Sequence, residues 1–213
     1  MKLHYLEKVK STQIYAKEYL NNNEDSDICF YTYNQTSGLG SQNNTWEGEN
    51  GNLFFSFIIC IKDLPKDLPL QSASIYFAYI LKELLTEQGS SLILKWPNDF
   101  YLQQKIGGLI TNKINDKLIC GIGLNIVKTK SYSEVLDIDI NKKELLKLYF
   151  NKLELYPSWK QIFSKYKLEF HLNKKYFTKI NNEKLSMKDA TLNEDGSLNI
   201  NNKKVYSLRW LKL

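Results

Sequence analysis

Residues 94–110, LKWPNDFYLQQKIGGLI, place an abrupt turn between two apolar segments. The apolar run Leu92, Ile93 and Leu94 is typical of the end of a buried strand. The run Pro-Asn-Asp at 97–99 then predicts a turn, because proline restricts the backbone and Asn and Asp favour turns. This part of the chain therefore predicts a strand, a turn and a second strand.

Charged groups and bare backbone lie on both sides of this turn. Lys95 precedes it, Lys105 follows it, and Gly107 and Gly108 allow a ligand to approach the main chain closely. Two cations beside accessible backbone suit a polyanion such as a nucleotide phosphate. The residues alone leave a second interpretation open, an ordinary strand-turn-strand with solvated lysines.

The same string closely resembles the KWPND…K-(I/L)-(A/G)-G-(I/L) signature of biotin–protein ligases. Enzymes of this family join biotin to ATP and then transfer it to a lysine of a carrier protein. Other segments extend the resemblance along nearly the whole chain.

The N-terminal segment resembles the start of the ligase core. Residues 3–9 predict a short strand, and Ser11 is a suitable N-cap for a helix from Thr12 to about residue 21. Ser-Thr-Gln at 11–13 is similar to the family's S-T-(N/Q), which hydrogen-bonds the ureido head of biotin. The resemblance therefore implies that Ser11, Thr12 and Gln13 bind biotin.

Residues 28–33 predict a strand, and a polar, glycine-containing loop then runs to Trp46. This loop resembles the family's Q-(T/A)-x-G-R-G-R-x-G-R-x-W, which closes over biotin and the adenylate. Its family arginines are replaced here by Leu39, Ser41 and Asn44. Backbone N–H groups can still bind phosphate, and Trp46 offers an aromatic face for adenine. We expect the loop to be mobile without ligand and ordered with biotinyl-adenylate.

Two further apolar segments match the family. GNLFFSFIICI, residues 51–61, predicts a buried strand and resembles G-N-L-(Y/F)-x-S. Residues 105–114 and 117–126 predict a hairpin around Asn115 and Asp116. The second segment contains GIGLN, similar to the ligase G-(I/A)-G-(I/L)-N, whose Asn, here Asn125, points into the nucleotide site.

The remaining elements complete the fold prediction. Helices are expected at 68–89, 141–155 and 157–171, with Asn141 and Ser158 as caps of the last two. Short alternating segments after residue 174 predict a small β domain. The resemblance implies an α+β fold, the class II synthetase-like biotin/lipoate ligase fold. Its catalytic domain would span 1–173, with a mixed sheet backed by helices, and a small SH3-like β-barrel would span 174–213.

Composition limits the alternatives. The 213 residues carry a net charge of +6, but the lysines are scattered among acidic residues and Asn, so we expect no specific DNA binding. The chain also begins near the segment that resembles the catalytic core, so we expect the monofunctional type without an N-terminal DNA-binding domain.

Cys29, Cys60 and Cys120 lie in apolar runs without CxxC spacing, which indicates buried thiols in a cytoplasmic protein. No apolar run of membrane-spanning length occurs, and the two His residues, His4 and His171, predict no metal site.

The predicted activity is that of a biotin–[acetyl-CoA-carboxylase] ligase. Biotin and ATP, with Mg²⁺, give biotinyl-5′-AMP, and a lysine of a biotin carboxyl carrier protein domain then accepts the biotin. Acetyl-CoA carboxylase is the expected source of that domain, and pyruvate carboxylase is a second one. Lys105 is the first choice for bridging the biotin carboxylate and the α-phosphate, and Lys95 is the second. The resemblance implies that Asp99 orients the carrier lysine or takes its proton.

The predicted site falls into two overlapping sets, and no metal ligand from the protein is assigned. The biotin-binding set is Ser11, Thr12, Gln13, Gln35, Gly38, Leu39, Gly40, Ser41, Lys105, Gly107 and Gly108. The ATP-binding set is Trp46, Lys95, Asn98, Lys105 and Asn125.

The sequence leaves three alternative functions open. A lipoate ligase shares the fold, but its arginine- and glycine-rich signatures are missing here. A biotin-responsive repressor predicts a helix-turn-helix, which this sequence lacks. A non-catalytic biotin-binding protein is compatible with the missing loop arginines.

Overall fold

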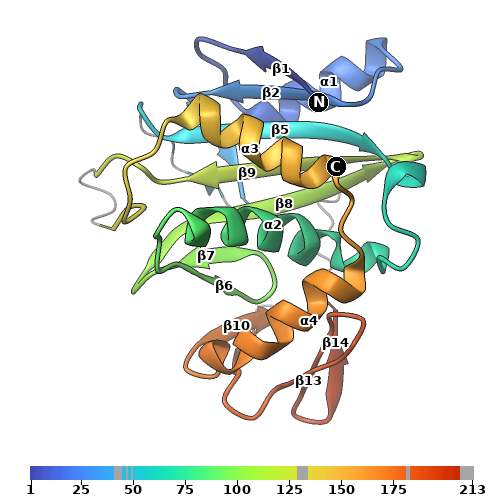
Figure 1. The fold of residues 1–213 in the computed structure, drawn as a ribbon, viewed down its shortest axis with the longest axis vertical. Coiled ribbons are helices and arrows are strands. Elements are labelled where there is room, and N and C mark those ends of the chain that lie inside the picture. Colours follow the sequence, from blue (N-terminus) through green and yellow to red (C-terminus); the bar gives the residue numbers. More distant parts are fainter. Residues whose placement is uncertain (41–44, 47, 49, 129–133, 181–182, 207–213) are drawn as a thin grey trace.

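The computed structural model describes residues 1–40, 45, 46, 48, 50–128, 134–180 and 183–206. Its central feature is a seven-stranded sheet in the order β1-β2-β5-β9-β8-β7-β6 (Figure 1). The strands are β1 (Lys2–Tyr5), β2 (Ile28–Thr32), β5 (Leu53–Cys60), β6 (Ile93–Lys95), β7 (Asp99–Tyr101), β8 (Lys105–Ile114) and β9 (Lys117–Leu124). The pair β1–β2 is parallel and the other neighbours are antiparallel, so the sheet is mixed, as predicted.

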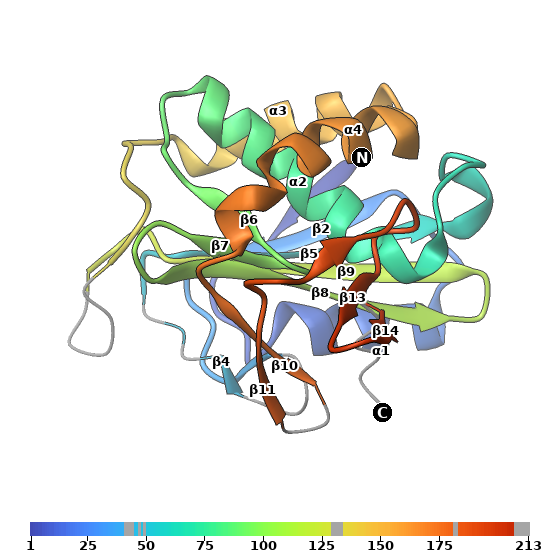
Figure 2. The ribbon, with the colours of Figure 1, turned by 90° about the horizontal axis from the view of Figure 1, so that it is seen from below.

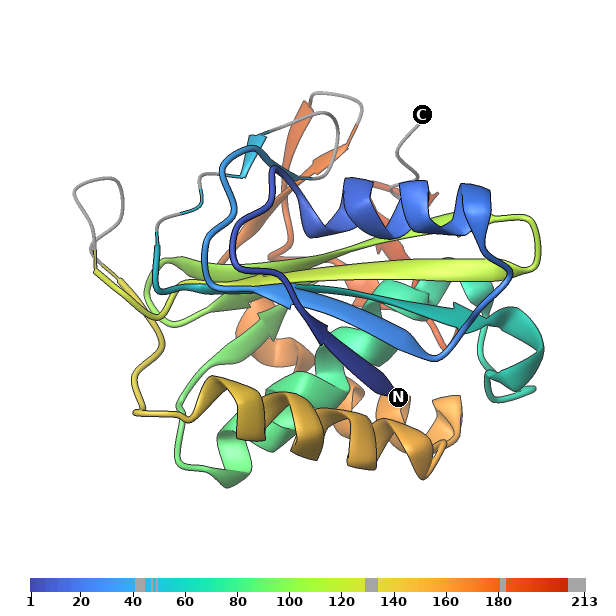
Figure 3. The ribbon, with the colours of Figure 1, turned by 90° about the horizontal axis from the view of Figure 1, so that it is seen from above.

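Helices cover both faces of the sheet (Figures 2 and 3). Helix α1 (Thr12–Asn22) lies on one face, where Ala16 packs with Phe30, Ile58 and Ile119. The opposite face is covered by α2 (Ala73–Glu87), α3 (Lys142–Glu154) and α4 (Trp159–Glu169). The sheet is thus enclosed by helices, with the larger core beneath α2, α3 and α4.

Strand β5 shows why the two faces differ. Side chains alternate along a strand, so Phe55, Phe57 and Ile59 enter the core beneath α2 and α3. Ile58 points to the α1 face, and Ser56, which contacts Thr12 of α1, lies on the same side. The one hydroxyl in LFFSFIIC therefore faces the side of the sheet that α1 covers.

Strands β7 and β8 carry the signature motif. The turn that was predicted at Pro97 leads directly into β7, and Asp99 pairs with Gly108 of β8. The apolar run before the turn leads into β6 at the edge of the sheet, and Leu92 and Leu94 are buried there, as predicted for the end of a buried strand.

The C-terminal segment forms two small sheets. One pairs β10 (Phe177–Ile180) with β11 (Glu183–Ser186), and the other pairs β12 (Thr191–Leu192), β13 (Leu198–Ile200) and β14 (Lys203–Val205). Among the described residues these strands do not close a barrel, so the predicted SH3-like barrel is not confirmed. Two short strands, β3 (Gly38–Leu39) and β4 (Thr45–Trp46), form a separate pair that reaches over the α1 face of the sheet.

Candidate active site

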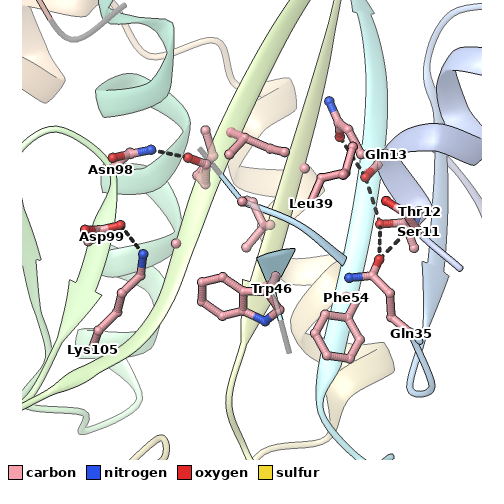
Figure 4. Close-up of a pocket in the computed structure, with 18 residues that line it drawn as sticks. Ser11, Thr12, Gln13, Gln35, Leu39, Trp46, Phe54, Asn98, Asp99 and Lys105 are labelled. Atoms are coloured by element: carbon pink, nitrogen blue, oxygen red, sulfur yellow. Dashed lines mark hydrogen bonds and ion pairs between the residues drawn. The ribbon is translucent and has the colours of Figure 1, made fainter. Parts of the chain in front are cut away.

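A pocket of about 460 Å³, counted to its open mouth, lies on the α1 face of the sheet (Figure 4). It is bounded by the start of α1, the β3–β4 pair, the hairpin β8–β9 and the turn before β7. Eighteen residues line it: Ser11, Thr12, Gln13, Gln35, Leu39, Gly40, Trp46, Phe54, Ser56, Asn98, Asp99, Lys105, Gly108, Leu109, Ile110, Gly121, Ile122 and Gly123.

One end of the pocket is a buried polar network at the N-terminus of α1. Ser11 caps the helix, its hydroxyl accepting from the Ile14 N–H at 3.4 Å, as the sequence predicts. The Thr12 backbone N–H donates to Gln35 Oε1 at 2.8 Å. The Thr12 hydroxyl lies 3.2 Å from the same oxygen and 2.9 Å from Ser56 Oγ. Side chains from three separate segments are thereby fixed at this end.

Gln13 continues this network under the hairpin. Its amide nitrogen donates to Asn112 Oδ1 at 2.9 Å and to the Ile119 carbonyl at 3.1 Å. Its Oε1 lies 2.9 Å from Ser56 Oγ. A Cβ at Gly121 would overlap that oxygen, so glycine is required there for the Gln13 side chain to lie against β9.

Apolar side chains line the middle of the pocket. Phe54, Leu39, Leu109, Ile110 and Ile122 form its walls. Gly123 gives room for the Trp46 ring, since an added Cβ would lie 3.2 Å from two of its atoms. The middle therefore favours an apolar ligand body, while hydrogen-bonding groups gather at the α1 end.

The far end of the pocket is charged. Lys105 Nζ lies 2.7 Å from Asp99 Oδ1 and 5.1 Å from the centroid of the Trp46 ring. Lys105 comes from β8 and Asp99 from β7, and Figure 4 shows the pair facing each other across the mouth from Trp46. The predicted cation, carboxylate and aromatic face are thus brought together.

Two predicted asparagines present unpartnered oxygens among the described residues. The Asn98 amide nitrogen donates to the Leu109 carbonyl, while its buried Oδ1 has no partner. Asn125 Oδ1 is likewise buried without a partner, as is the Trp46 indole nitrogen. Buried polar atoms are normally hydrogen-bonded, so these atoms suit a bound ligand. Asn98 lines the pocket, whereas Asn125 follows β9 outside its lining.

Three other predicted residues, Gly38, Gly107 and Ser41, are not part of the described lining. Gly38 and Gly107 lie just behind it, where an added Cβ would approach Gln35 Nε2 and the Gly123 carbonyl, respectively. Ser41 lies outside the described residues, as does Asn44, which replaces a family arginine.

Lys95, the second predicted catalytic cation, does not line the pocket. Its Nζ lies 4.7 Å from the Tyr101 ring centroid, 5.9 Å from that of Tyr176, and 3.4 Å from the Tyr101 hydroxyl. Burial, together with the charge of Asp99, raises the pKa of Tyr101 to about 12, so this hydroxyl keeps its proton at neutral pH. Lys95 therefore lies against two aromatic rings on the side of the hairpin next to the C-terminal segment.

The sequence prediction missed several lining residues, of which Ser56 and Phe54 are the most informative. Ser56 is a lone hydroxyl within an apolar strand, and such a residue is a signal for a polar contact inside the core. Asn112, a buried amide on a strand, was also missed, because the sequence indicated no partner for it.

The three cysteines are free and buried, and burial raises the pKa of the Cys29 and Cys120 thiols.

The described residues contain neither a metal-binding cluster of side chains nor a membrane-spanning helix. No group of three or more His, Cys, Asp or Glu side chains is placed there to hold a metal ion. No helix in the described ranges has the length and apolar character needed to cross a bilayer.

Several solved structures share this fold. Biotin acetyl coenzyme A carboxylase synthetase from Helicobacter pylori, solved with bound biotinylated ATP, is 39% identical with a TM-score of 0.92, covering 96% of this chain and 99% of that one. The R40G mutant of the Aquifex aeolicus biotin protein ligase, in complex with biotin, is 26% identical with a TM-score of 0.75, covering 98% and 97%.

Curated relatives match a shorter region. Bifunctional ligase/repressor BirA of Bacillus spizizenii is 27% identical over 128 residues, 57% of this chain and 39% of that protein. Biotin–protein ligase 2 of Arabidopsis thaliana is 31% identical over 139 residues, 56% of this chain and 42% of that protein. The chain spans about two fifths of the length of these relatives. The model of the biotin/lipoate A/B protein ligase family matches residues 5–126, more than half of the chain, and the chain belongs to this family.

Proposed function

We propose that this chain is an ATP-dependent biotin–protein ligase, of the biotin–[acetyl-CoA-carboxylase] ligase type. The observation that carries the proposal is the order of chemistry along the pocket. A hydrogen-bonding end at Thr12 and Gln35 is followed by apolar walls at Phe54 and Ile122, and then by the cation Lys105.

Biotin has the same order of groups. Its ureido head both donates and accepts hydrogen bonds, its ring and chain are apolar, and its tail is a carboxylate. Lipoate carries a disulfide ring in place of the ureido head, so it would gain no strong hydrogen bond from the polar groups at the α1 end. The polar network therefore favours biotin over the lipoate alternative.

The first step would take place at the charged end. A biotin carboxylate oxygen attacks the α-phosphorus of ATP, and the bond to pyrophosphate breaks, giving biotinyl-5′-AMP. Two anions approach each other and charge builds at phosphorus, so a positioned cation stabilises the transition state more than the ground state. Lys105 Nζ would be this cation, and Asp99, 2.7 Å away, would hold it in place before substrates arrive.

The second step would use Asp99. The carrier lysine amine attacks the acyl carbon, AMP leaves, and the amine loses a proton. Once Lys105 turns to phosphate, the Asp99 carboxylate is released to orient the incoming ammonium or accept its proton. Trp46 would offer its ring to adenine, and Asn98 and Asn125 would meet donors of the nucleotide with their unpartnered oxygens.

Mg²⁺ is proposed to enter as the MgATP complex. The described residues offer no cluster of ligating side chains, and Mg²⁺ usually keeps several waters and binds through substrate phosphates. The proposed acceptor is a biotin carboxyl carrier protein domain of acetyl-CoA carboxylase, with pyruvate carboxylase as a second source. The buried free thiols support a reducing compartment, and we propose the cytoplasm.

We also propose a boundary near residue 173, with residues 174–213 as a small β domain of SH3-like type. Support comes from the short strands β10 to β14, which begin shortly after that point. Several side chains of this segment nevertheless share one core with the catalytic part, including Met187, Leu198 and Ile200.

The test is incubation of the protein with MgATP and labelled biotin or lipoate, with and without a carrier domain. We expect biotinyl-adenylate with biotin alone, and labelled carrier when the domain is added. Adenylate from lipoate but not from biotin would support the lipoate alternative. Biotin binding without any adenylate would favour a non-catalytic binding protein.

A further inference from the structure

The hydrogen-bond network at the α1 end has a direction that follows from the donors and acceptors involved. The Ile119 carbonyl can only accept, so it fixes the Gln13 amide with Nε2 toward β9. The two protons of that nitrogen go to Ile119 O and to Asn112 Oδ1. Gln13 Oε1 is consequently an acceptor, turned toward Ser56.

Ser56 has one hydroxyl proton and two oxygen neighbours, each 2.9 Å away. Gln13 Oε1 carries no proton, so this contact is favourable when Ser56 donates to it. In a first arrangement, the Thr12 hydroxyl donates to Ser56 Oγ, which completes the contact between the two hydroxyls. In a second arrangement, the Thr12 hydroxyl donates to Gln35 Oε1 at 3.2 Å, an oxygen that already accepts from the Thr12 backbone N–H.

In both arrangements the Thr12 proton is directed at the protein, so Thr12 Oγ1 can meet a ligand only with its lone pairs. We propose that Ser56 and Gln13 are positioning residues that orient the Thr12 hydroxyl as an acceptor for an N–H group of the substrate. This assignment rests on the proposed function, because it names what the pocket recognises in a ureido compound. It also revises the predicted role of Gln13 from a direct biotin contact to an indirect one.

The side chains of this network are buried. Thr12 is 3% exposed, Gln13 5% and Ser56 0%, so bulk water is not available to reorient these groups. Hydroxyl rotors in such a network are set by their fixed neighbours, and here the fixed neighbour is a strand carbonyl. The chain runs Thr12 to Ser56 to Gln13 to Ile119 O, from the pocket to the backbone of β9.

A double-mutant cycle tests this order, with biotin dissociation constants measured by calorimetry. Ser56→Ala should weaken biotin binding about tenfold in the wild-type background, and less than twofold in Thr12→Val, because Ser56 acts through Thr12. Gln13→Met should repeat the pattern and serves as the second variant. The matched control is Ser72→Ala, another buried serine, whose hydroxyl donates to the Asp195 carbonyl 2.5 Å away and does not line the pocket. It should leave biotin binding unchanged in both backgrounds.

The outcomes separate this assignment from the proposed function. Equal losses for Ser56→Ala and Gln13→Met in both backgrounds would show that these residues act independently of Thr12, and would overturn the hydrogen-bond order while leaving biotin ligation intact. Wild-type protein that binds no biotin would overturn both. Thermal unfolding of each variant, compared with Ser72→Ala, identifies any loss that comes from reduced stability.

Discussion

Lys105 is the cation at the mouth of the pocket, and its surroundings decide what a substitution should do. Its Nζ is held by Asp99 and lies close to the Trp46 ring, while Lys95 lies outside the lining. The sequence placed both lysines near the phosphates because both flank the same turn. The strand register separates them: Lys95 pairs with Asp99 across β6–β7, whereas Lys105 begins β8 and enters the pocket.

Lys105→Ala should therefore nearly abolish adenylate formation. Removing one charge-assisted contact made in the transition state typically costs about 3–4 kcal/mol, or roughly 10²–10³ in rate. Lys105→Arg should also be poor, since a planar guanidinium does not replace a compact ammonium. Single-turnover adenylation at saturating MgATP and biotin is the measurement. The matched control is Lys113→Ala, an exposed lysine on the same strand. Retention of more than about a tenth of the wild-type rate by Lys105→Ala would remove this lysine from the central role.

Gly121→Ala is the second prediction at this scale. The added Cβ would overlap Gln13 Oε1, so the amide must move and its contacts with Ile119 and Ser56 must weaken. We expect the KM for biotin to rise at least about tenfold, equivalent to roughly 1.4 kcal/mol, with little change in the KM for ATP. Steady-state adenylation with each substrate varied in turn measures this. An equal rise in both KM values would indicate a general distortion of β9 instead.

At the scale of elements, local chemistry predicted most boundaries. Ser11, Asn141 and Ser158 cap the helices that they were expected to cap. Asn115 and Asp116 form the turn between β8 and β9, and Asn115 has the positive φ, 52°, that such turns use. The helix expected at 68–89 begins later, at Ala73, because residues 70–72 form a 3-10 turn after Pro69. The strand expected at 3–9 ends at Tyr5, and Val9 forms only an isolated bridge with Gln35 among the described residues.

The sequence predicted less about which buried polar groups meet. Gln13, Ser56 and Asn112 come from three elements that are far apart in sequence, and their contacts depend on the packing of α1 against β5 and β9. A helix cap or a strand propensity can be predicted from neighbouring residues. The contacts of this network can be predicted only once the register of the sheet is known. The family resemblance supplied Thr12 and Gln35, but it did not indicate what lies behind them.

The β3–β4 pair gives the prediction at this scale. Gly38 and Leu39 pair with Trp46 and Thr45 in two-residue strands, and such a short pair has little stability by itself. Biotin and MgATP together should increase the protection of these four amides against hydrogen exchange. Ordering costs about 1–2 kcal/mol of backbone entropy per residue, which ligand contacts must offset. Exchange measured with and without both ligands is the test, with the amides of β5 as an internal reference. Equal protection in the two states would argue against ordering of the β3–β4 pair by the ligands.

At the scale of the whole molecule, the C-terminal segment is joined to the rest of the chain by buried contacts. The Trp96 indole donates to the Gly196 carbonyl at 2.9 Å, and the Trp96 backbone N–H donates to Asn173 Oδ1 at 2.7 Å. The Trp159 indole donates to the Glu194 carbonyl at 2.9 Å. Thus the Trp that follows Lys95 in the signature turn contributes to the interface with the C-terminal strands, a role that the sequence alone did not indicate.

Because these contacts and a shared core connect the two parts, they should unfold together. Ile200, 3% exposed on β13, belongs to the same core cluster as Tyr76 and Phe57. Ile200→Ala should lower the free energy of unfolding by about 2–5 kcal/mol, the usual cost of a buried Ile-to-Ala change. Phe177→Ala, at a side chain 46% exposed in the same segment, is the matched control and should cost much less. In denaturant titrations, circular dichroism of the helices and tryptophan fluorescence should shift by the same amount with Ile200→Ala. A fluorescence transition that moves while the helical signal stays in place would instead make residues 174–213 an independently folding domain.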